Sequence, residues 1–260
     1  MSTLSGPSGT KVNRLLQAWP KGAVATTAWL KAQGISRQLA ARYQQAQWIT
    51  PLGKGAYARA GDSVDWTGAL SSIQRDAPES SLRAAGKTAL SLHGLGHHVS
   101  PTGQDPVWIT GSPKERLPVW FKNSSSWATR INFFTANLWA NVPTQAWVTT
   151  VQIGEIEVRL STPECAILEV LHLVPQYQSL EEARQLMTGL TSLRTHFLSV
   201  LLEKGGTIKV RRLFLALAEE SGHQWFRYID VGRIALGSGN RSMGLGGKLH
   251  PRYQIALPPP

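Results

Sequence analysis

The sequence predicts an α+β protein with a small N-terminal part, residues 1–78, and a larger C-terminal part, residues 79–260. Three observations lead to this prediction. Helical periodicity interrupted by glycine and proline covers the first 47 residues, and a short hairpin follows it. Strand-like segments then dominate residues 119–160. Helical segments come after them, and strands followed by a block of helices are typical of α+β folds.

Composition limits the class of protein. The chain has 260 residues, of which 42% are hydrophobic and 17% charged, as in globular proteins. Its single cysteine, Cys165, excludes internal disulfides and cysteine-based zinc fingers. The longest apolar stretch is too short to span a bilayer and contains Glu169 and His172. Because no signal peptide is visible either, we expect a soluble cytoplasmic protein without membrane partners.

Positive charge is concentrated at the N-terminus. The formal net charge is +11, and the first 61 residues contain eight Lys or Arg but no acid before Asp62. The rest of the chain carries 19 basic and 16 acidic side chains. A field of one sign is what a polyanion-binding surface requires. The alternative is a basic face that only keeps the protein soluble.

The first 36 residues predict a helix-turn-helix. A first helix ends at Pro20, and a second begins near Thr27 and ends at Gly34, which can take the left-handed conformation of a helix C-terminus. Ser36 is a natural N-cap for a third helix. Two helices joined by a tight glycine turn are typical of DNA-binding modules.

The third helix, residues 36–47, has two faces. Leu39, Tyr43 and Ala46 are spaced to pack inward. The opposite face is rich in arginine and glutamine, whose side chains reach guanine and adenine edges in the major groove. We therefore predict that this face contacts DNA through Ser36, Arg37, Gln38, Arg42 and Gln45.

A hairpin completes the predicted module. Residues 48–52 and 56–59 are strand-like, and Gly53-Lys54-Gly55 lies between them. A hairpin beside a recognition helix is a wing. Lys54, at its tip, is placed to meet a phosphate.

Several short motifs follow one another along most of the chain. They are LLQAWP at 15–20, WL at 29–30, GISRQL at 34–39, residues 53–61, DWTGAL at 65–70, GKTAL at 86–90, STPECAILE at 161–169, LGSGNR at 236–241 and YQI at 253–255. Together they resemble AbiE-type antitoxins, the regulators of type IV, abortive-infection toxin–antitoxin systems.

This resemblance implies a two-part regulator rather than an enzyme. The winged helix-turn-helix would repress its own operon by binding inverted repeats in promoter DNA. The larger domain would neutralise a nucleotidyltransferase-like toxin without forming a stable complex. The sequence has no heptad zipper, so we expect a monomer in solution.

Two other functions stay open. The first is a winged-helix transcription factor whose C-terminal domain senses a small ligand, with no toxin involved. The second is an RNA-modifying or nucleotide-using enzyme. A neighbouring gene for a nucleotidyltransferase would favour the antitoxin.

Two further helices are predicted, of which the first should pack on the winged module and the second begins the larger part. A loop-rich stretch at residues 101–118, which holds four prolines, follows. Strands follow, and Pro163 then opens a helix at its first turn. The predicted helices are 65–74, 80–92, a helix from 163, 179–190, 192–202 and 208–220, and the predicted strands are 119–121, 131–134, 147–148 and 156–160.

The C-terminal tail is also basic, with no acid after Asp230. It predicts either a second polyanion surface, for RNA, or a solvated rim. Trp225 and Phe226 beside Arg227 form the aromatic cluster best suited to base stacking, whereas Trp19, Trp29 and Trp48 are expected in the core. The basic candidates are Arg211, Arg212, Arg227, Arg233, Arg241 and Lys248.

The remaining constellations do not predict chemistry. Gly86-Lys87-Thr88 resembles the end of a phosphate-binding loop, but the required first glycine is Ser81 and the preceding residues look helical. His93, His97 and His98 lack a further ligand for a metal. Glu164 and Glu169 do not share a helix face, and Cys165 is expected to be buried and inert. We predict no catalytic site, metal or cofactor.

Overall fold

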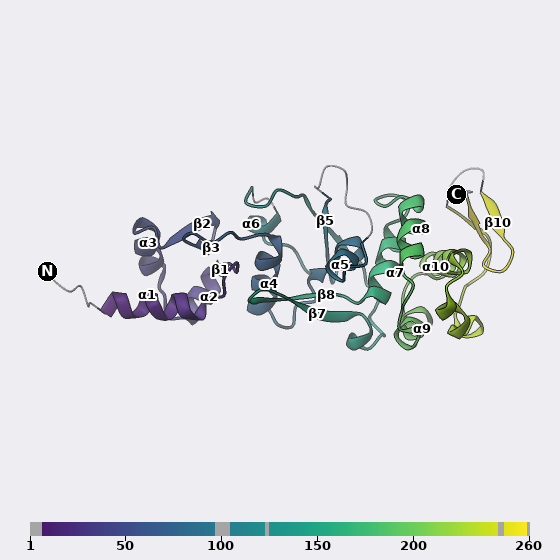
Figure 1. Cartoon of the computed structure of the whole chain (residues 1–260), viewed down its shortest axis with the longest axis horizontal. Helices are drawn as coiled ribbons and strands as arrows, with labels where there is room; N and C mark the ends of the chain where they lie inside the picture. The colour runs from purple at the N-terminus through teal and green to yellow at the C-terminus, as the bar shows by residue number, and fades with distance from the viewer. Residues whose placement is uncertain (1–6, 97–104, 123–124, 244–246, 259–260) are drawn as a thin grey trace.

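The computed structural model describes residues 7–96, 105–122, 125–243 and 247–258. The molecule is elongated, with the N-terminal module at one end, a mixed sheet with its helices in the middle and a helical block at the other end (Figure 1). The mixture of helices and sheets confirms the predicted α+β class.

The N-terminal module is a helix-turn-helix followed by a wing, as predicted. Its sheet has the order β1-β3-β2, with both pairs antiparallel. The two-residue β1 was not predicted, since it is too short to show a periodicity. The elements are α1 (Pro7–Ala18), β1 (Ala25–Thr26), α2 (Thr27–Ala32), α3 (Arg37–Gln45), β2 (Ile49–Gly53) and β3 (Ala56–Arg59).

The core of this module differs from the prediction at two positions. Trp19 is buried and its Nε1 donates a hydrogen bond to the Ala23 carbonyl at 2.9 Å. Trp48, however, is 44% exposed, and Ala46 is exposed as well. Helix α3 ends at Gln45, and Gln47 then takes a φ of 57°. Because of this turn, Ala46 and Trp48 do not lie on the buried side of α3 with Tyr43.

Helix α4 (Trp66–Asp76) joins the module to the larger part, as predicted for this segment. Asp65 caps it by accepting hydrogen bonds from the backbone of its first turn. The Ser72 hydroxyl accepts a hydrogen bond from Val24 N at 2.8 Å. Gly68 lies so close to Gly22 that a Cβ would lie 1.8 Å from the Gly22 carbonyl oxygen, so α4 requires glycine at this contact.

A five-stranded mixed sheet forms the centre of the larger part. Its order is β6-β5-β4-β8-β7. The pairs β5–β6 and β4–β8 are parallel, and the pairs β4–β5 and β7–β8 are antiparallel. The strands are β4 (Arg83–Ala84), β5 (Val107–Gly111), β6 (Ile131–Thr135), β7 (Val148–Ile153) and β8 (Ile156–Ser161).

Helices pack on this sheet and continue beyond it, and a small sheet of order β10-β11-β9 lies near the C-terminus. Short 3-10 turns occur at 144–146, 224–228 and 231–233. The helices are α5 (Gly86–Leu92), α6 (Val119–Lys122), α7 (Pro163–Leu173), α8 (Leu180–Gly189), α9 (Thr195–Lys204) and α10 (Ile208–Ser221), and the strands are β9 (Arg241–Ser242), β10 (Lys248–His250) and β11 (Ile255–Leu257).

Three predicted segments of the larger part are wrong. Residues 80–92 hold a short strand, β4, before α5, because Arg83 and Ala84 pair with both β5 and β8. The predicted loop contains β5, whose residues are all buried in the sheet. Residues 119–121 belong to α6 rather than to a strand, since the Pro118 carbonyl accepts hydrogen bonds from the backbone of residues 121 and 122.

Glu115 fastens the turn after β5 and should make stability depend on acid. Its carboxylate accepts hydrogen bonds from the hydroxyls of Ser80 and Ser81 and from Ser112 N at 2.6 Å. Burial alone would raise the pKa of this carboxyl, but these hydrogen bonds outweigh it and lower the pKa from 4.5 to about 2. The carboxylate therefore stabilises the fold above pH 4.5, and this contribution disappears as the pH falls towards 2.

Replacing Glu115 by glutamine should lower the free energy of unfolding at pH 7 by about 1–2 kcal/mol, after allowance for partial solvent exposure. In urea titrations the difference between wild type and variant should shrink as the pH falls from 4.5 towards 2. The exposed Glu157→Gln variant is the control. A Glu115→Gln difference that stays constant over this pH range would contradict the assignment.

Candidate nucleic-acid interface

Helix α3 is held at its first turn by local contacts. Gly34 has a φ of 74° and ends the preceding turn, and Ile35 is buried beneath it. The Ser36 hydroxyl accepts a hydrogen bond from Leu39 N at 3.2 Å. Burial of Ala40 and Tyr43 then orients the helix. The predicted DNA-contacting residues are all exposed on its other side: Ser36, Arg37, Gln38, Arg42 and Gln45.

A cleft of about 830 Å³ lies between α2, the start of α3 and the tip of the wing. Lys31, Arg37 and Lys54 all line it, and no carboxylate is among its lining residues in the described part of the chain. Thr27 holds the wing tip against α2, because its backbone N donates to the Gly55 carbonyl at 2.9 Å. The fold therefore brings the wing lysine and the recognition helix to one positively charged concave surface.

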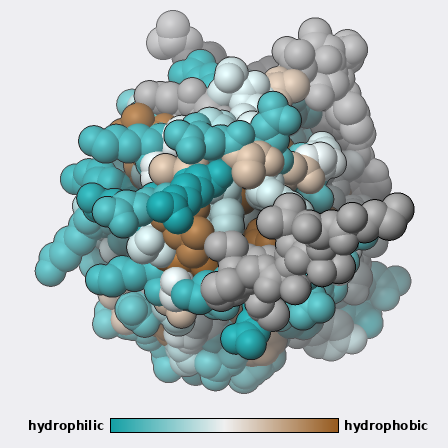
Figure 2. Space-filling view, turned by 90° about the vertical axis from the view of Figure 1, so that its left-hand side faces the viewer, coloured by the Kyte–Doolittle hydropathy of each residue, from teal (hydrophilic) through white to brown (hydrophobic). Residues whose placement is uncertain are grey.

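Viewed from this end, the molecule presents mainly hydrophilic side chains around a smaller apolar patch (Figure 2). Two acids that follow the module in sequence are engaged in contacts of their own. Asp62 accepts a hydrogen bond from Gly22 N, and Asp76 pairs with Arg75 at 2.9 Å. Polar side chains with cations above an apolar base can hold a phosphate backbone while the helix reaches the base edges.

Lys31 is a member of this surface that the sequence did not single out. Its place in the cleft depends on how α2 packs against the wing, whose tip residue Lys54 is 23 positions further along the chain. The sequence indicated only that residues 1–61 contain eight cations and no acids, and it gave no reason to prefer Lys31 over the other seven.

The predicted C-terminal basic surface is only partly exposed. Arg212 is fully buried and donates hydrogen bonds to the carbonyls of Leu236, Gly239 and Gln254, so it cannot meet a polyanion. Arg211 is half-buried and is bonded to the carbonyls of Gly205 and Ala235.

The other four predicted cations at this end are exposed. Arg233 is paired with Glu203 at 2.9 Å. Arg227, Arg241 and Lys248 are exposed, so these three residues form what is left of the predicted surface. The expected stacking cluster changes too, since Trp225 is buried between Phe214 and His223.

Both halves of the chain match models of one family. Residues 8–101 match the family described as "Transcriptional regulator, AbiEi antitoxin N-terminal domain". Residues 104–258 match the family described as "Transcriptional regulator, AbiEi antitoxin, Type IV TA system". The chain belongs to the AbiEi antitoxin family.

One solved structure supports the fold of this AbiEi family member. The crystal structure of RV2827C protein from Mycobacterium tuberculosis is similar with a TM-score of 0.66 over 96% of this chain and 91% of that chain. The sequence identity is 15%, so this likeness concerns the fold. No curated protein sequence matches the chain. Within the described residues, no helix is long and apolar enough to cross a membrane.

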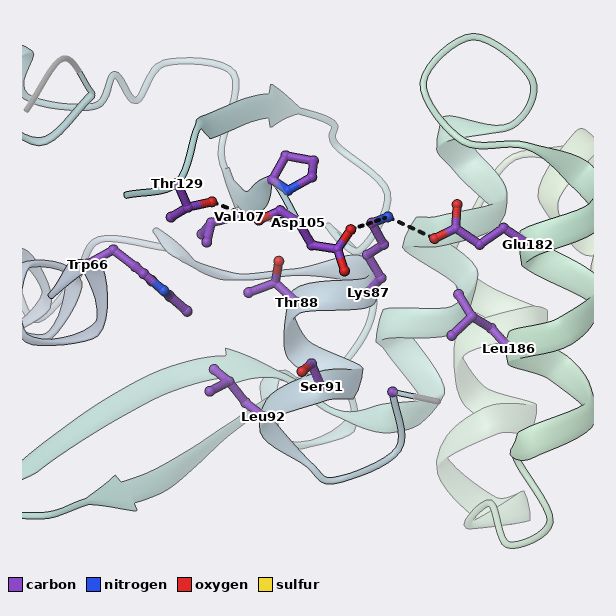
Figure 3. Close-up of a pocket in the computed structure, with 12 residues that line it drawn as sticks. Trp66, Lys87, Thr88, Ser91, Leu92, Asp105, Val107, Thr129, Glu182 and Leu186 are labelled. Carbon is purple, nitrogen blue, oxygen red and sulfur yellow. Dashed lines mark hydrogen bonds and ion pairs between the residues drawn. The ribbon is translucent and has the colours of Figure 1, made fainter. Parts of the chain in front are cut away.

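The AbiEi chain also has a cavity of about 300 Å³ between α5, β5 and α8, with Trp66 of α4 at its edge (Figure 3). Lys87 lies in this cavity, 2.7 Å from Glu182 and 3.9 Å from Asp105. The lysine follows a strand, contrary to the helical prediction for residues 81–85. Its charge is already matched by two carboxylates, which argues against a role in binding a nucleotide phosphate.

Three further titratable groups of this AbiEi protein make contacts within the fold. The carboxylate of the buried Glu164 accepts a hydrogen bond from the Arg194 guanidinium at 2.8 Å. Burial raises the pKa of the Cys165 thiol, and the nearby Glu169 raises it further. His93 makes a 3.0 Å hydrogen bond with the Ser161 carbonyl. His97 and His98 lie outside the described residues. The described residues contain no cluster that could hold a metal ion.

Proposed function

We propose that this AbiEi-family protein represses its own operon by binding inverted repeats in promoter DNA through α3 and the wing. The observation that carries the proposal is the cleft that Arg37 and Lys54 both line, with no carboxylate among its described lining residues. We further propose that the protein is a monomer in solution, with one copy on each half-site, and that the DNA-binding domain comprises residues 1–78.

In this proposal the two elements have different roles. Arg37, Gln38, Arg42 and Gln45 read base edges or contact the backbone next to them, since arginine matches guanine and glutamine matches adenine. Ser36 and Lys54 hold phosphates, which set the register of the protein on the duplex but carry no sequence information.

Replacing Arg42 by alanine should weaken operator binding by about 1–3 kcal/mol and relax specificity at one base pair. Replacing Lys54 by alanine should weaken binding to all sequences similarly and reduce the salt dependence. Both effects can be measured by gel shift with the upstream DNA of the operon and with base-substituted versions of it. Unchanged operator affinity in Arg42→Ala would show that this helix face does not read DNA.

We propose that residues 79–260 neutralise a nucleotidyltransferase-like toxin without a stable complex, and that Arg227, Arg241 and Lys248 contribute through a polyanion such as RNA. Induction of the neighbouring toxin gene together with the full-length protein tests this function. Arg42→Ala should still rescue growth although repression is weakened, whereas joint replacement of the three cations by alanine should reduce rescue. Rescue that is unaffected by the triple variant would remove this surface from the proposal.

The cavity around Lys87 is the observation that favours the alternative, a winged-helix regulator with a ligand-sensing C-terminal domain. Trp66, Thr88 and Ser91 line it together with the ion pairs of Lys87. A thermal-shift screen of small metabolites, repeated with Leu186→Trp to fill the cavity, tests it. A ligand that alters DNA binding in wild type only, together with the absence of a toxin gene nearby, would favour this alternative over the antitoxin.

A further inference from the structure

A second group of exposed cations lies in the larger part of the molecule, in residues 112–122. Lys114 and Arg116 are in the turn after β5, and Lys122 ends α6. All three side chains are exposed. The only acid of the segment, Glu115, is hydrogen-bonded to Ser81 N at 2.8 Å and to the serine hydroxyls described above. The segment therefore presents three cations and a carboxylate that is already engaged.

This segment is packed against the wing. Helix α6 contacts both β2 and α4, and it lies beside the wing in Figure 1. Phe121 is fully buried and anchors α6 in the core. Trp120 lies so close to Gly53 that a Cβ on the glycine would be 2.7 Å from the Trp120 Cβ. Helix α6 and its last residue, Lys122, are thus held next to the hairpin, and Lys114 and Arg116 lie in the segment that leads into this helix.

The contacts form a continuous path from the recognition helix to α6. Gly53 directly precedes Lys54 in the chain, and Lys54 lines the same cleft as Arg37 at the start of α3. Of the acids of the larger part, Glu79 and Glu157 interact with Arg159, and Glu155 accepts a hydrogen bond from Lys21 N at 3.0 Å. Lys54 directly follows β2, and Lys122 ends the helix that contacts this strand, so cations lie on both sides of the boundary between the winged module and the larger part.

We propose that residues 112–122 extend the DNA interface, with Lys114, Arg116 and Lys122 binding phosphates of the duplex that flanks the bases read by α3. This inference rests on the proposed DNA-binding function. A duplex is stiff over tens of base pairs, so DNA held by α3 and the wing continues past the hairpin as a rod. Its phosphates recur about every 1.7 Å along the axis, and each cation placed on one releases counterions.

The test compares full-length wild type with the triple variant Lys114→Ala/Arg116→Ala/Lys122→Ala. Fluorescence anisotropy would measure affinity for the operon's own upstream DNA and for a random duplex of equal length, between 50 and 200 mM salt. In the triple variant, the slope of log affinity against log salt should become shallower by roughly 0.9 for each phosphate contact that is lost. The factor by which affinity falls between 50 and 200 mM salt should then be roughly threefold smaller for each lost contact. The change should be the same on both duplexes, because phosphates carry no sequence information.

The control is Lys204→Ala/Arg252→Ala, which removes two positive charges from exposed positions at the opposite end of the molecule that have no proposed binding role. It should leave the salt slope unchanged, and all variants should keep the wild-type unfolding temperature. The inference is overturned if the triple variant keeps the wild-type slope while Lys54→Ala lowers it, or if the control lowers the slope equally. If Arg42→Ala and Lys54→Ala also bind normally, the proposed function is wrong and this inference falls with it.

Discussion

Replacing Arg212 by methionine is expected to lower the free energy of unfolding by about 3–5 kcal/mol. The side chain is fully buried, and its Nε donates to the Leu236 carbonyl at 2.7 Å. A second nitrogen donates to the Gln254 carbonyl at 3.0 Å and also to the Gly239 carbonyl. Methionine fills most of the volume but leaves three carbonyl groups without their donor, and such groups cost about 1–3 kcal/mol each when water does not replace it.

The three acceptors belong to the segment after α10, so the loss should be greatest there. Limited proteolysis should cut the tail of Arg212→Met faster than that of wild type, and urea denaturation should measure the total effect. Arg212→Lys should recover only part of the loss, because an ammonium lacks the planar fork of the guanidinium. The exposed Arg241→Met should change stability by less than about 0.5 kcal/mol. An equally small effect in Arg212→Met would mean that water satisfies the three carbonyls.

Replacing Glu169 by glutamine is the second change with a large expected effect, again about 3–5 kcal/mol of stability. Glu169 and Arg83 form a buried ion pair at 2.6 Å, with side chains that are 1% and 5% exposed. The carboxylate also accepts a hydrogen bond from Gly86 N at 3.0 Å, and Arg83 Nε donates to the Ser161 hydroxyl at 2.8 Å. The pair thus joins α7 to β4, β8 and the start of α5. Glutamine keeps the shape but leaves the Arg83 charge buried without its counterion.

Two comparisons separate charge from packing. Glu203→Gln breaks the ion pair with the exposed Arg233 and should cost less than about 1 kcal/mol. The double variant Arg83→Met/Glu169→Leu removes both charges and should be markedly more stable than Glu169→Gln alone. Chemical denaturation at pH 7 measures all three. A double variant that is less stable than the single one would show that the hydrogen bonds matter more than the buried charge.

The sequence predicted the elements whose boundaries depend on neighbouring residues. Ser36 caps α3 through Leu39 N, and Thr162 caps α7 through Cys165 N, with Pro163 in the first turn. The wing was predicted from two strand-like runs around Gly53-Lys54-Gly55. In each case the deciding contacts join residues a few positions apart, so the local pattern contains the information.

The predictions that were wrong depend on contacts between distant residues. Arg83 and Ala84 form a strand because β5 and β8 lie on either side of them, and β8 is more than 70 residues away. Arg212 was predicted to be a surface cation, because the sequence does not show that carbonyls of the C-terminal tail accept its hydrogen bonds in the interior. Trp225 is buried because α10 supplies Phe214 as its stacking partner.

The α+β class, the helix-turn-helix with its wing and the absence of acids from the first 61 residues follow from the amino-acid sequence alone. Charge, capping and turn chemistry are properties of short segments, and these features follow from them. The folded chain was needed to see which cations line one cleft, which are buried, and that α6 lies against the wing. Exposure and proximity are set by packing between segments far apart in the chain, and no local pattern encodes that packing.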